Sequence, residues 1–157
     1  MKEKFVKAYM EAAEVFAKLS YAKRLQVGAI VVKDDRIISI GYNGTPAGWN
    51  NVCEEEVTTY EPYIIDPGGP EYMMGVVNLK TKPEVVHAEA NSIAKLAKSQ
   101  ESGEGSVMFI THAPCIECSK LIYTSGIKKV YFKNVYRDDS GLEFLKKCNV
   151  EVEQVNA

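Results

Sequence analysis

Two cysteines and a histidine are the residues of this sequence whose types and spacing point most directly to chemistry. Cys115 and Cys118 are separated by two residues at the start of a helix-like run, so their sulfurs share one helical face. Zinc binds thiolate and imidazole ligands tetrahedrally, and a Cys-x2-Cys pair is a common half-site. His87, in the string HAEAN, is the candidate third ligand. The pattern predicts one zinc ion per chain, with a fourth position open for water, as in a catalytic site.

Glu89 follows His87 by two residues, which is about 200° around an ideal helix. A regular helix cannot direct both side chains to one metal, so we expect His87 at an irregular helix start. Glu89 would then lie beside the reacting water as a proton carrier for hydrolysis at an amino-bearing ring carbon. The strand-like run before Pro114 places the cysteines at a helix N-terminus, where the helix dipole favours thiolates.

Other residues near this set have plainer interpretations. We expect His112 to orient the loop before the cysteines, Glu117 to face solvent, and Cys148 to be a buried small apolar residue. Two alternatives to a catalytic zinc stay open. The Cys-x2-Cys pair can be a buried or redox pair beside a core histidine, or part of a structural zinc site completed by Cys53.

The elements that must position these residues follow from hydrophobic periodicity and turn signals. The first two strands are joined only by Asp34-Asp35, so they must form an antiparallel hairpin. Later helices and strands alternate, which predicts parallel pairing through right-handed crossovers and helices on both faces. The expected fold class is a three-layer α/β/α domain with a central mixed five-stranded sheet opening with that hairpin. The expected elements are a helix over 2–19, strands over 26–33 and 36–41, a helix over 86–99, a strand over 107–111, a helix from PCIEC to Gly126, a strand over 130–132, a helix over 141–148 and a last edge strand, VEVEQV.

Residues 50–83 show no sustained period, although several aromatic residues lie there. Loops of this length are uncommon in a compact domain unless they are lids, binding loops or disordered. The alternatives are a lid or subunit contact, and a partly ordered insertion without function. We therefore expect one domain over 1–157 with an insertion at about 45–83.

The bulk composition excludes some function classes. The 157 residues are 46% hydrophobic and 25% charged, with a net charge of −2 and a pI of about 5.8. These values predict no general attraction to nucleic acid or to an anionic membrane. No apolar run approaches 18 residues, and charges interrupt the N-terminal helix, so neither a membrane span nor a signal peptide is expected. Cytoplasm is the expected compartment.

In this order the motifs resemble the cytidine and deoxycytidylate deaminase superfamily, and within it the deoxycytidylate (dCMP) deaminases of bacteria or phages. The resemblance rests on RLQVGAIVV, GYNGTPAG, HAEANSI, APCIECSKLI and SGIKKVYF, which together span nearly the whole chain. It implies a cytidine-deaminase-like fold and zinc-dependent conversion of dCMP to dUMP, the thymidylate precursor. It also implies a homohexamer that is activated by dCTP with Mg²⁺ and inhibited by dTTP. His87, Cys115 and Cys118 would be the zinc ligands, and Glu89 the proton shuttle.

The same resemblance, with the chemistry of phosphate binding, suggests the remaining site residues. A 5′-monophosphate needs a cation, and the Arg137 guanidinium can hold phosphate through paired hydrogen bonds; its alternative is a solvated loop charge. The GYNGTPAG turn would cradle the triphosphate regulator with backbone amides. Expected substrate-binding residues are Asn43, which would contact the sugar, with Arg137, Tyr136, Ala88 and Lys23; expected regulator-binding residues are Gly41, Tyr42, Asn43, Gly44 and Arg24.

Some phage relatives in this branch bind a second, structural zinc through a cysteine in the insertion, and Cys53 matches that position. Its partner positions hold Val85 and Ala22 or Lys23, so no second zinc is expected. Three other functions stay open: a tRNA adenosine deaminase, a free cytidine deaminase, and a non-catalytic structural zinc or nucleotide-binding module. The acidic pI and the GYNGTPAG turn count against the first, and Glu89 beside an open coordination position counts against the last.

Overall fold

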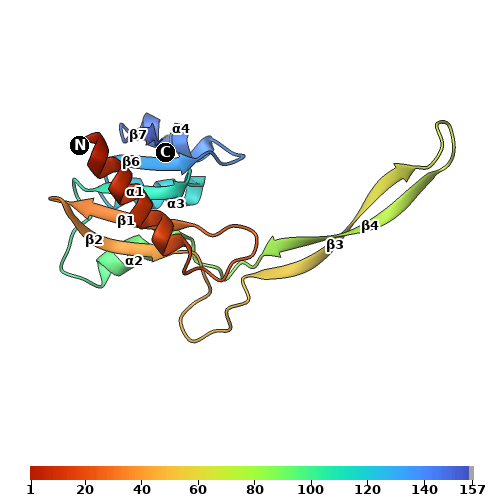
Figure 1. The fold of residues 1–157 in the computed structure, drawn as a ribbon, viewed down its shortest axis with the longest axis horizontal. Coiled ribbons are helices and arrows are strands. Elements are labelled where there is room, and N and C mark those ends of the chain that lie inside the picture. The colour runs from red at the N-terminus through yellow and green to blue at the C-terminus, as the bar shows by residue number, and fades with distance from the viewer. Residues whose placement is uncertain (156–157) are drawn as a thin grey trace.

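A five-stranded mixed sheet with the order β2-β1-β5-β6-β7 forms the centre of the computed structural model, which describes residues 1–155 (Figure 1). β1 pairs antiparallel with both β2 and β5, whereas β5, β6 and β7 are mutually parallel. The predicted hairpin, the mixed sheet and the edge position of the last strand are confirmed. The strands are β1 (Gly28–Lys33), β2 (Arg36–Tyr42), β5 (Val107–His112), β6 (Lys129–Asn134) and β7 (Glu151–Gln154).

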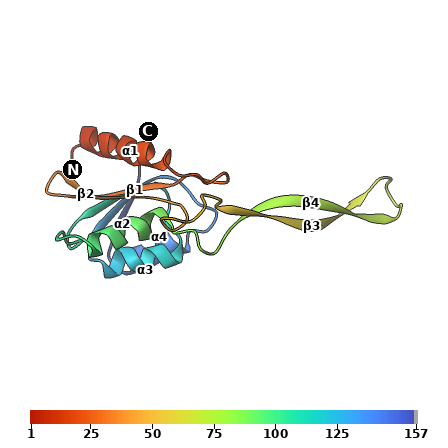
Figure 2. The ribbon, with the colours of Figure 1, turned by 90° about the horizontal axis from the view of Figure 1, so that it is seen from below.

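Helices cover both faces of this sheet, as Figure 2 shows. One face carries α1 (Glu3–Ala17), and the other carries α2 (Ala88–Ala97), α3 (Ile116–Thr124) and α4 (Ser140–Lys147). Strand residues alternate between two cores, because successive side chains of a strand point to opposite faces. The three-layer α/β/α class is confirmed, with one correction: the crossover helices α3 and α4 share a face, and α1 covers the other.

The alternation is clearest in β1, whose residues are buried on both sides of the sheet. Ala29 and Val31 pack into the core under α2, α3 and α4. Ile30 and Val32 pack with α1, together with Phe109 of β5. The body therefore has two apolar layers, and both include residues of the strands that lead to the candidate site.

The insertion forms a long antiparallel ribbon, β3 (Glu54–Ile64) and β4 (Glu71–Thr81), which projects away from the body (Figure 1). All eleven residues of each strand are paired, and at 3.4 Å per residue the ribbon is roughly 35 Å long. Among the helices and strands of residues 1–155, β3 and β4 contact each other extensively and make no comparable contact with another element. No helix or strand was expected over residues 50–83 from the sequence, so the two strands of this ribbon were not predicted.

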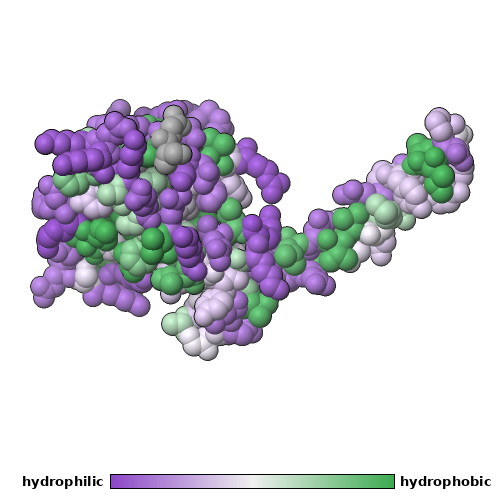
Figure 3. Space-filling model, in the orientation of Figure 1, coloured by the Kyte–Doolittle hydropathy of each residue, from purple (hydrophilic) through white to green (hydrophobic). Residues whose placement is uncertain are grey.

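Apolar side chains are exposed along this ribbon, as the green patches in Figure 3 show. A two-stranded ribbon has no layer to cover either face, so its side chains remain in contact with water. The exposed apolar residues of the ribbon are Tyr60, Tyr63, Ile64, Ile65, Tyr72, Met73, Met74, Val77 and Leu79.

No helix of residues 1–155 has both the length and the apolar character needed to cross a membrane.

Candidate functional site

His87, Cys115 and Cys118 meet where two helices begin. His87 is the N-cap residue of α2, with extended backbone angles (φ −68°, ψ 153°), so the expected irregular helix start is observed. Cys115 is the N-cap residue of α3 (φ −70°, ψ 168°), and Cys118 lies in the first turn of that helix. Both helices thus direct their N-terminal amides and the positive ends of their dipoles to the site.

The geometry of these three side chains fits a zinc ion. The His87 Nδ1 atom lies 3.6 Å from the Cys115 sulfur and 3.4 Å from the Cys118 sulfur. Tetrahedral zinc with bonds of about 2.3 Å to sulfur and 2.0 Å to nitrogen separates these ligand atoms by about 3.5 Å. Among the described residues, no other group of three His, Cys, Asp or Glu side chains lies close enough to share a metal. A zinc ion bound here would use the Nδ1 atom of His87.

The electrostatics of the set favour a thiolate at the helix start. Hydrogen bonding by Cys118 and His87 lowers the pKa of Cys115 to about 4. The same interaction and burial raise the pKa of Cys118, and hydrogen bonding to Cys115 raises the pKa of His87. A shared negative charge on the sulfurs is what a divalent cation requires of its ligands.

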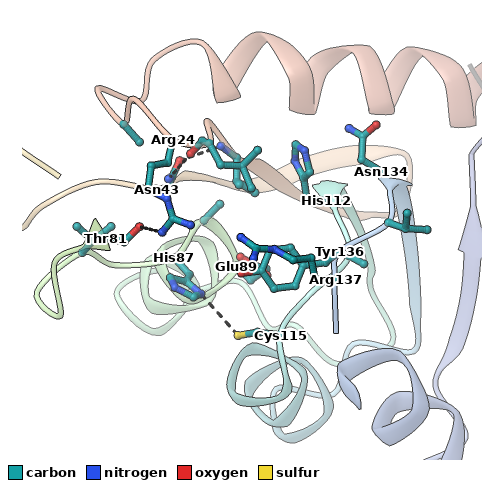
Figure 4. A pocket seen from close by; sticks show the side chains of 17 residues that line it. Arg24, Asn43, Thr81, His87, Glu89, His112, Cys115, Asn134, Tyr136 and Arg137 are labelled. Atoms are coloured by element: carbon teal, nitrogen blue, oxygen red, sulfur yellow. Dashed lines mark hydrogen bonds between the residues drawn. The ribbon is translucent and has the colours of Figure 1, made fainter. Parts of the chain in front are cut away.

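Glu89 lies beside this set and is almost completely buried, with 4% of its surface exposed. Burial raises the pKa of its carboxyl to about 7. A carboxyl with that pKa can both accept and release a proton at neutral pH. Figure 4 shows Glu89 at the centre of the pocket, next to His87 and Cys115.

The pocket has a volume of about 520 Å³ and is lined by both halves of the chain. Four of the five predicted substrate residues line it: Asn43, Ala88, Tyr136 and Arg137. Arg24, predicted for the regulator, lies in the same pocket (Figure 4). Asn43 also holds the loop after α1, because its Oδ1 accepts from the Val27 amide and its Nδ2 donates to the Leu25 carbonyl, both at 2.8 Å.

The other predicted residues lie outside this pocket. Lys23 is exposed and contributes only its backbone amide, to Glu54, so it does not line the pocket as expected. Gly41 packs under α2, where an added Cβ would overlap the Ala88 carbonyl oxygen. The glycine of this turn is therefore required by the close approach of β2 to the helix that carries Glu89. Tyr42 and Gly44 also lie outside the pocket.

Three polar residues that line the pocket, His112, Asn134 and Thr81, were not predicted to bind a metal, substrate or regulator. His112 ends β5, and burial lowers the pKa of its ring, which favours the neutral form. Asn134 ends β6 and donates through Nδ2 to the Thr111 carbonyl at 2.9 Å. Both follow from a rule that ligands bind beyond the carboxyl ends of strands. Thr81 enters from the ribbon, and no local sequence signal indicates it.

The remaining cysteines have structural surroundings. Cys53 is buried with Ala22 and Val85 in a small apolar cluster at the base of the ribbon. Cys148 ends α4 and is half-buried against the core rather than buried as predicted. Glu117 is exposed, as predicted, and forms an ion pair with Lys120 at 2.8 Å.

Comparison with known proteins agrees with this geometry. The family model described as the cytidine and deoxycytidylate deaminase zinc-binding region matches residues 3–134. ComE operon protein 2 of Bacillus subtilis (strain 168) is 31% identical over 148 residues, covering 94% of this chain and 69% of the relative. The deoxycytidylate deaminase of Enterobacteria phage T4 is 32% identical over 150 residues, covering 81% of this chain and 77% of the relative.

Among solved structures, the dCMP deaminase from the cyanophage S-TIM5 in complex with dCMP and dUMP superposes with a TM-score of 0.81. It is 42% identical in sequence, and the match covers 99% of both chains. The match includes the arrangement of the sheet, so the expected cytidine-deaminase-like fold is confirmed. The chain belongs to the family of cytidine and deoxycytidylate deaminases that share this zinc-binding region.

Proposed function

We propose that this protein deaminates dCMP hydrolytically, giving dUMP and ammonia. The observation that carries the proposal is a buried carboxyl, Glu89, beside a His/Cys/Cys set at the floor of a pocket with arginines around it. The relatives named as dCMP deaminases, one of them solved with dCMP and dUMP, support the same substrate. By this reaction the protein would supply the precursor of thymidylate.

Zinc bound by His87, Cys115 and Cys118 would supply Lewis-acid chemistry that makes a water molecule nucleophilic at neutral pH. Glu89 takes a proton from that water and delivers it to the ring nitrogen next to the amino-bearing carbon. After the oxygen has added to that carbon, Glu89 carries the remaining proton to the amine. The C–N bond then breaks, and the amine leaves as ammonia.

Other residues that line the pocket suit the nucleotide portion of the substrate. Arg137 and Tyr136 extend over the pocket toward Glu89 (Figure 4). A guanidinium binds the oxygens of phosphate in pairs, so Arg137 would hold the 5′-phosphate. Asn43 would contact the sugar, and the Ala88 backbone would line the base site.

A substrate panel tests this function. The zinc-loaded protein is incubated with dCMP, deoxycytidine, cytidine and a tRNA anticodon stem, and ammonia and inosine are measured. We expect dCMP to be deaminated at a far higher kcat/KM than deoxycytidine, with no inosine formed. Equal rates on dCMP and deoxycytidine would contradict the nucleotide assignment, and inosine formation would favour tRNA. No turnover of any substrate would favour a non-catalytic module.

We further propose regulation by nucleoside triphosphates, with dCTP and Mg²⁺ as activator and dTTP as inhibitor. The support is the family resemblance and the GYNGTPAG turn, in which Gly44 has open space where a Cβ would be. We expect dCTP with Mg²⁺ to lower the half-saturating dCMP concentration and dTTP to raise it. Hyperbolic kinetics that do not change with either triphosphate would contradict this regulation.

We also propose that the protein is a homo-oligomer, by resemblance a hexamer, and that the ribbon contacts a second copy. A two-stranded ribbon is at best marginally stable in water, and its exposed apolar residues need cover. Residues 54–81 contain six acidic side chains and one lysine, a net charge of −5, whereas the rest of the sequence has 18 basic and 15 acidic residues, a net charge of +3. An acidic, apolar ribbon therefore complements the body of another copy and disfavours nucleic acid.

Sedimentation equilibrium tests this arrangement. We expect the wild type to have a mass that is a multiple of 17.5 kDa. Residues 58–77 can be replaced by Asn-Gly, because Val57 and Asn78 are cross-strand neighbours and a two-residue turn can join them. This variant should dissociate into monomers, whereas replacing only the tip, residues 65–70, should leave the number of chains in the assembly unchanged. A monomeric wild type would contradict the proposal, and so would a shortened variant that assembles with the same number of chains as the wild type.

A further inference from the structure

The base of the ribbon also forms one wall of the pocket. Glu54 and Thr81 are the first cross-strand pair of β3 and β4, and Thr81 lines the pocket. Glu54 is a carboxylate that is only 7% exposed, which is costly unless its oxygens are hydrogen-bonded. Its Oε1 atom accepts from the backbone amides of Lys23 at 2.9 Å and Arg24 at 3.0 Å. Glu54 thus connects the ribbon to the loop between α1 and β1.

Arg24 is held at both ends by the ribbon. Glu54 holds its backbone, and its guanidinium Nη1 donates to the Thr81 hydroxyl oxygen at 3.2 Å (Figure 4). Residues 21–27 of this loop belong to no helix or strand, so ladder hydrogen bonds do not determine its conformation. Asn43 holds the neighbouring residues Leu25 and Val27, but the contacts that bind Arg24 itself come from Glu54 and Thr81, which are far away in the sequence.

We propose that Glu54 is a positioning residue that, with Thr81, holds Arg24 as a second cation for the phosphate of the substrate. The inference rests on the proposed function. A guanidinium has five N–H donors, so Arg24 retains others after one is used by Thr81. A phosphate monoester carries a charge of about −1.5 to −2 at neutral pH, which two arginines that line the same pocket, Arg24 and Arg137, can balance.

A simpler role for Glu54 is to anchor the ribbon without any effect on substrate. The two roles differ in what they change. An anchor alone affects stability or oligomer mass, and it affects dCMP and deoxycytidine equally. A positioning role affects the binding only of the ligand that carries a phosphate. Glutamine retains the accepting oxygen, so Glu54→Gln should preserve this role.

The test compares Glu54→Ala with Glu54→Gln and with a matched control, Glu55→Ala. Glu55 is the next residue of β3, is exposed, and points to the opposite face of the ribbon. We expect Glu54→Ala to raise KM for dCMP about fivefold and Arg24→Ala about tenfold, with kcat little changed. The KM and kcat values for deoxycytidine should not change in any of these variants. Glu54→Gln and Glu55→Ala should both resemble the wild type in their KM for dCMP.

Two further measurements keep the proposal testable. Thr81→Val removes the acceptor of Arg24 with little change of shape, so it replaces Glu54→Ala if that variant does not fold. Calorimetric titration with dUMP and deoxyuridine measures the phosphate preference without turnover. If the wild type prefers dCMP and Arg24→Ala keeps that preference, the inference is wrong and the proposed function stands. If the wild type shows no preference for dCMP over deoxycytidine, both the inference about Glu54 and Arg24 and the proposed function are wrong.

Discussion

Two aromatic pairs show how differently the body and the ribbon are built. In the body, Phe109 stacks on Tyr131 with ring centroids 4.8 Å apart, and both side chains are buried. In the ribbon, Tyr63 and Tyr72 lie opposite each other with centroids 5.6 Å apart, yet they are 41% and 43% exposed. The rings are stacked at 11° in the body and tilted at 36° in the ribbon, and only the first pair has helices and strands around it.

The two regions therefore obtain their stability from different sources. Burial of apolar surface contributes about 25 cal/mol per Å², and the body buries both faces of its sheet. The ribbon has only its own ladder and cross-strand pairs. The body can therefore hold a precise ligand set, whereas the ribbon offers an exposed surface and, at its base, one wall of the pocket.

The largest expected effect lies in the body and concerns chemistry rather than folding. Glu89→Ala should lower the rate of dCMP deamination by about 10³-fold or more, because the proton carrier is lost, while zinc and the fold are retained. Ammonia release and metal analysis check this. The control is Glu117→Ala, an exposed glutamate near the same cysteines. A loss of only a few-fold in Glu89→Ala would mean that another group carries the proton.

Metal content separates the site in the body from the cysteine at the base of the ribbon. Purified protein should hold about one zinc per chain, because one complete ligand set is present among the described residues. His87→Ala and Cys115→Ser should lose this zinc. Cys53→Ser should keep it, since Cys53 packs with Ala22 and Val85. Two zinc ions per chain, or full zinc in Cys115→Ser, would show that the ligands are assigned wrongly.

Removing one ring from each aromatic pair should affect the free energy of unfolding much less in the ribbon than in the body. Phe109→Ala should lower the free energy of unfolding by about 3–5 kcal/mol, because it leaves a cavity between Tyr9 and Tyr131. Tyr72→Ala should cost about 1 kcal/mol or less, the range of an exposed cross-strand pair. Urea unfolding followed by circular dichroism measures both. Equal losses would show that the ribbon is packed as tightly as the body.

Local sequence was enough to predict the elements of the body and the metal set. Strand β1 is apolar on both faces, and the hairpin turn at Asp34-Asp35 has no room for another topology. The cysteines follow a buried strand and begin a helix, so their place at the carboxyl edge of the sheet follows from chain order. His87 and Glu89 could be assigned different tasks because the helical period separates them.

The ribbon shows what periodicity cannot reveal. Alternation of polar and apolar residues arises when one face of a strand is buried, and neither face of β3 or β4 is covered in this structure. Apolar residues therefore occur on both faces, with Tyr60 and Met73 on one and Tyr63 and Met74 on the other. Without alternation, the segment lacks the sequence pattern that indicates strands. Its strands are defined by the hydrogen-bonded pairing of β3 with β4.

The candidate zinc ligands His87, Cys115 and Cys118, the candidate proton carrier Glu89 and the layers of the body could all be predicted from the sequence, because each is marked by a short motif or by hydrophobic periodicity. The structure was needed to show that Arg24, expected at the regulator site, lines the same pocket as Arg137. Arg24 enters the pocket because Glu54, 30 residues later, and Thr81, 57 residues later, hold it there. These contacts depend on how the ribbon meets the body, and neither Glu54 nor Thr81 lies in a motif that indicates them.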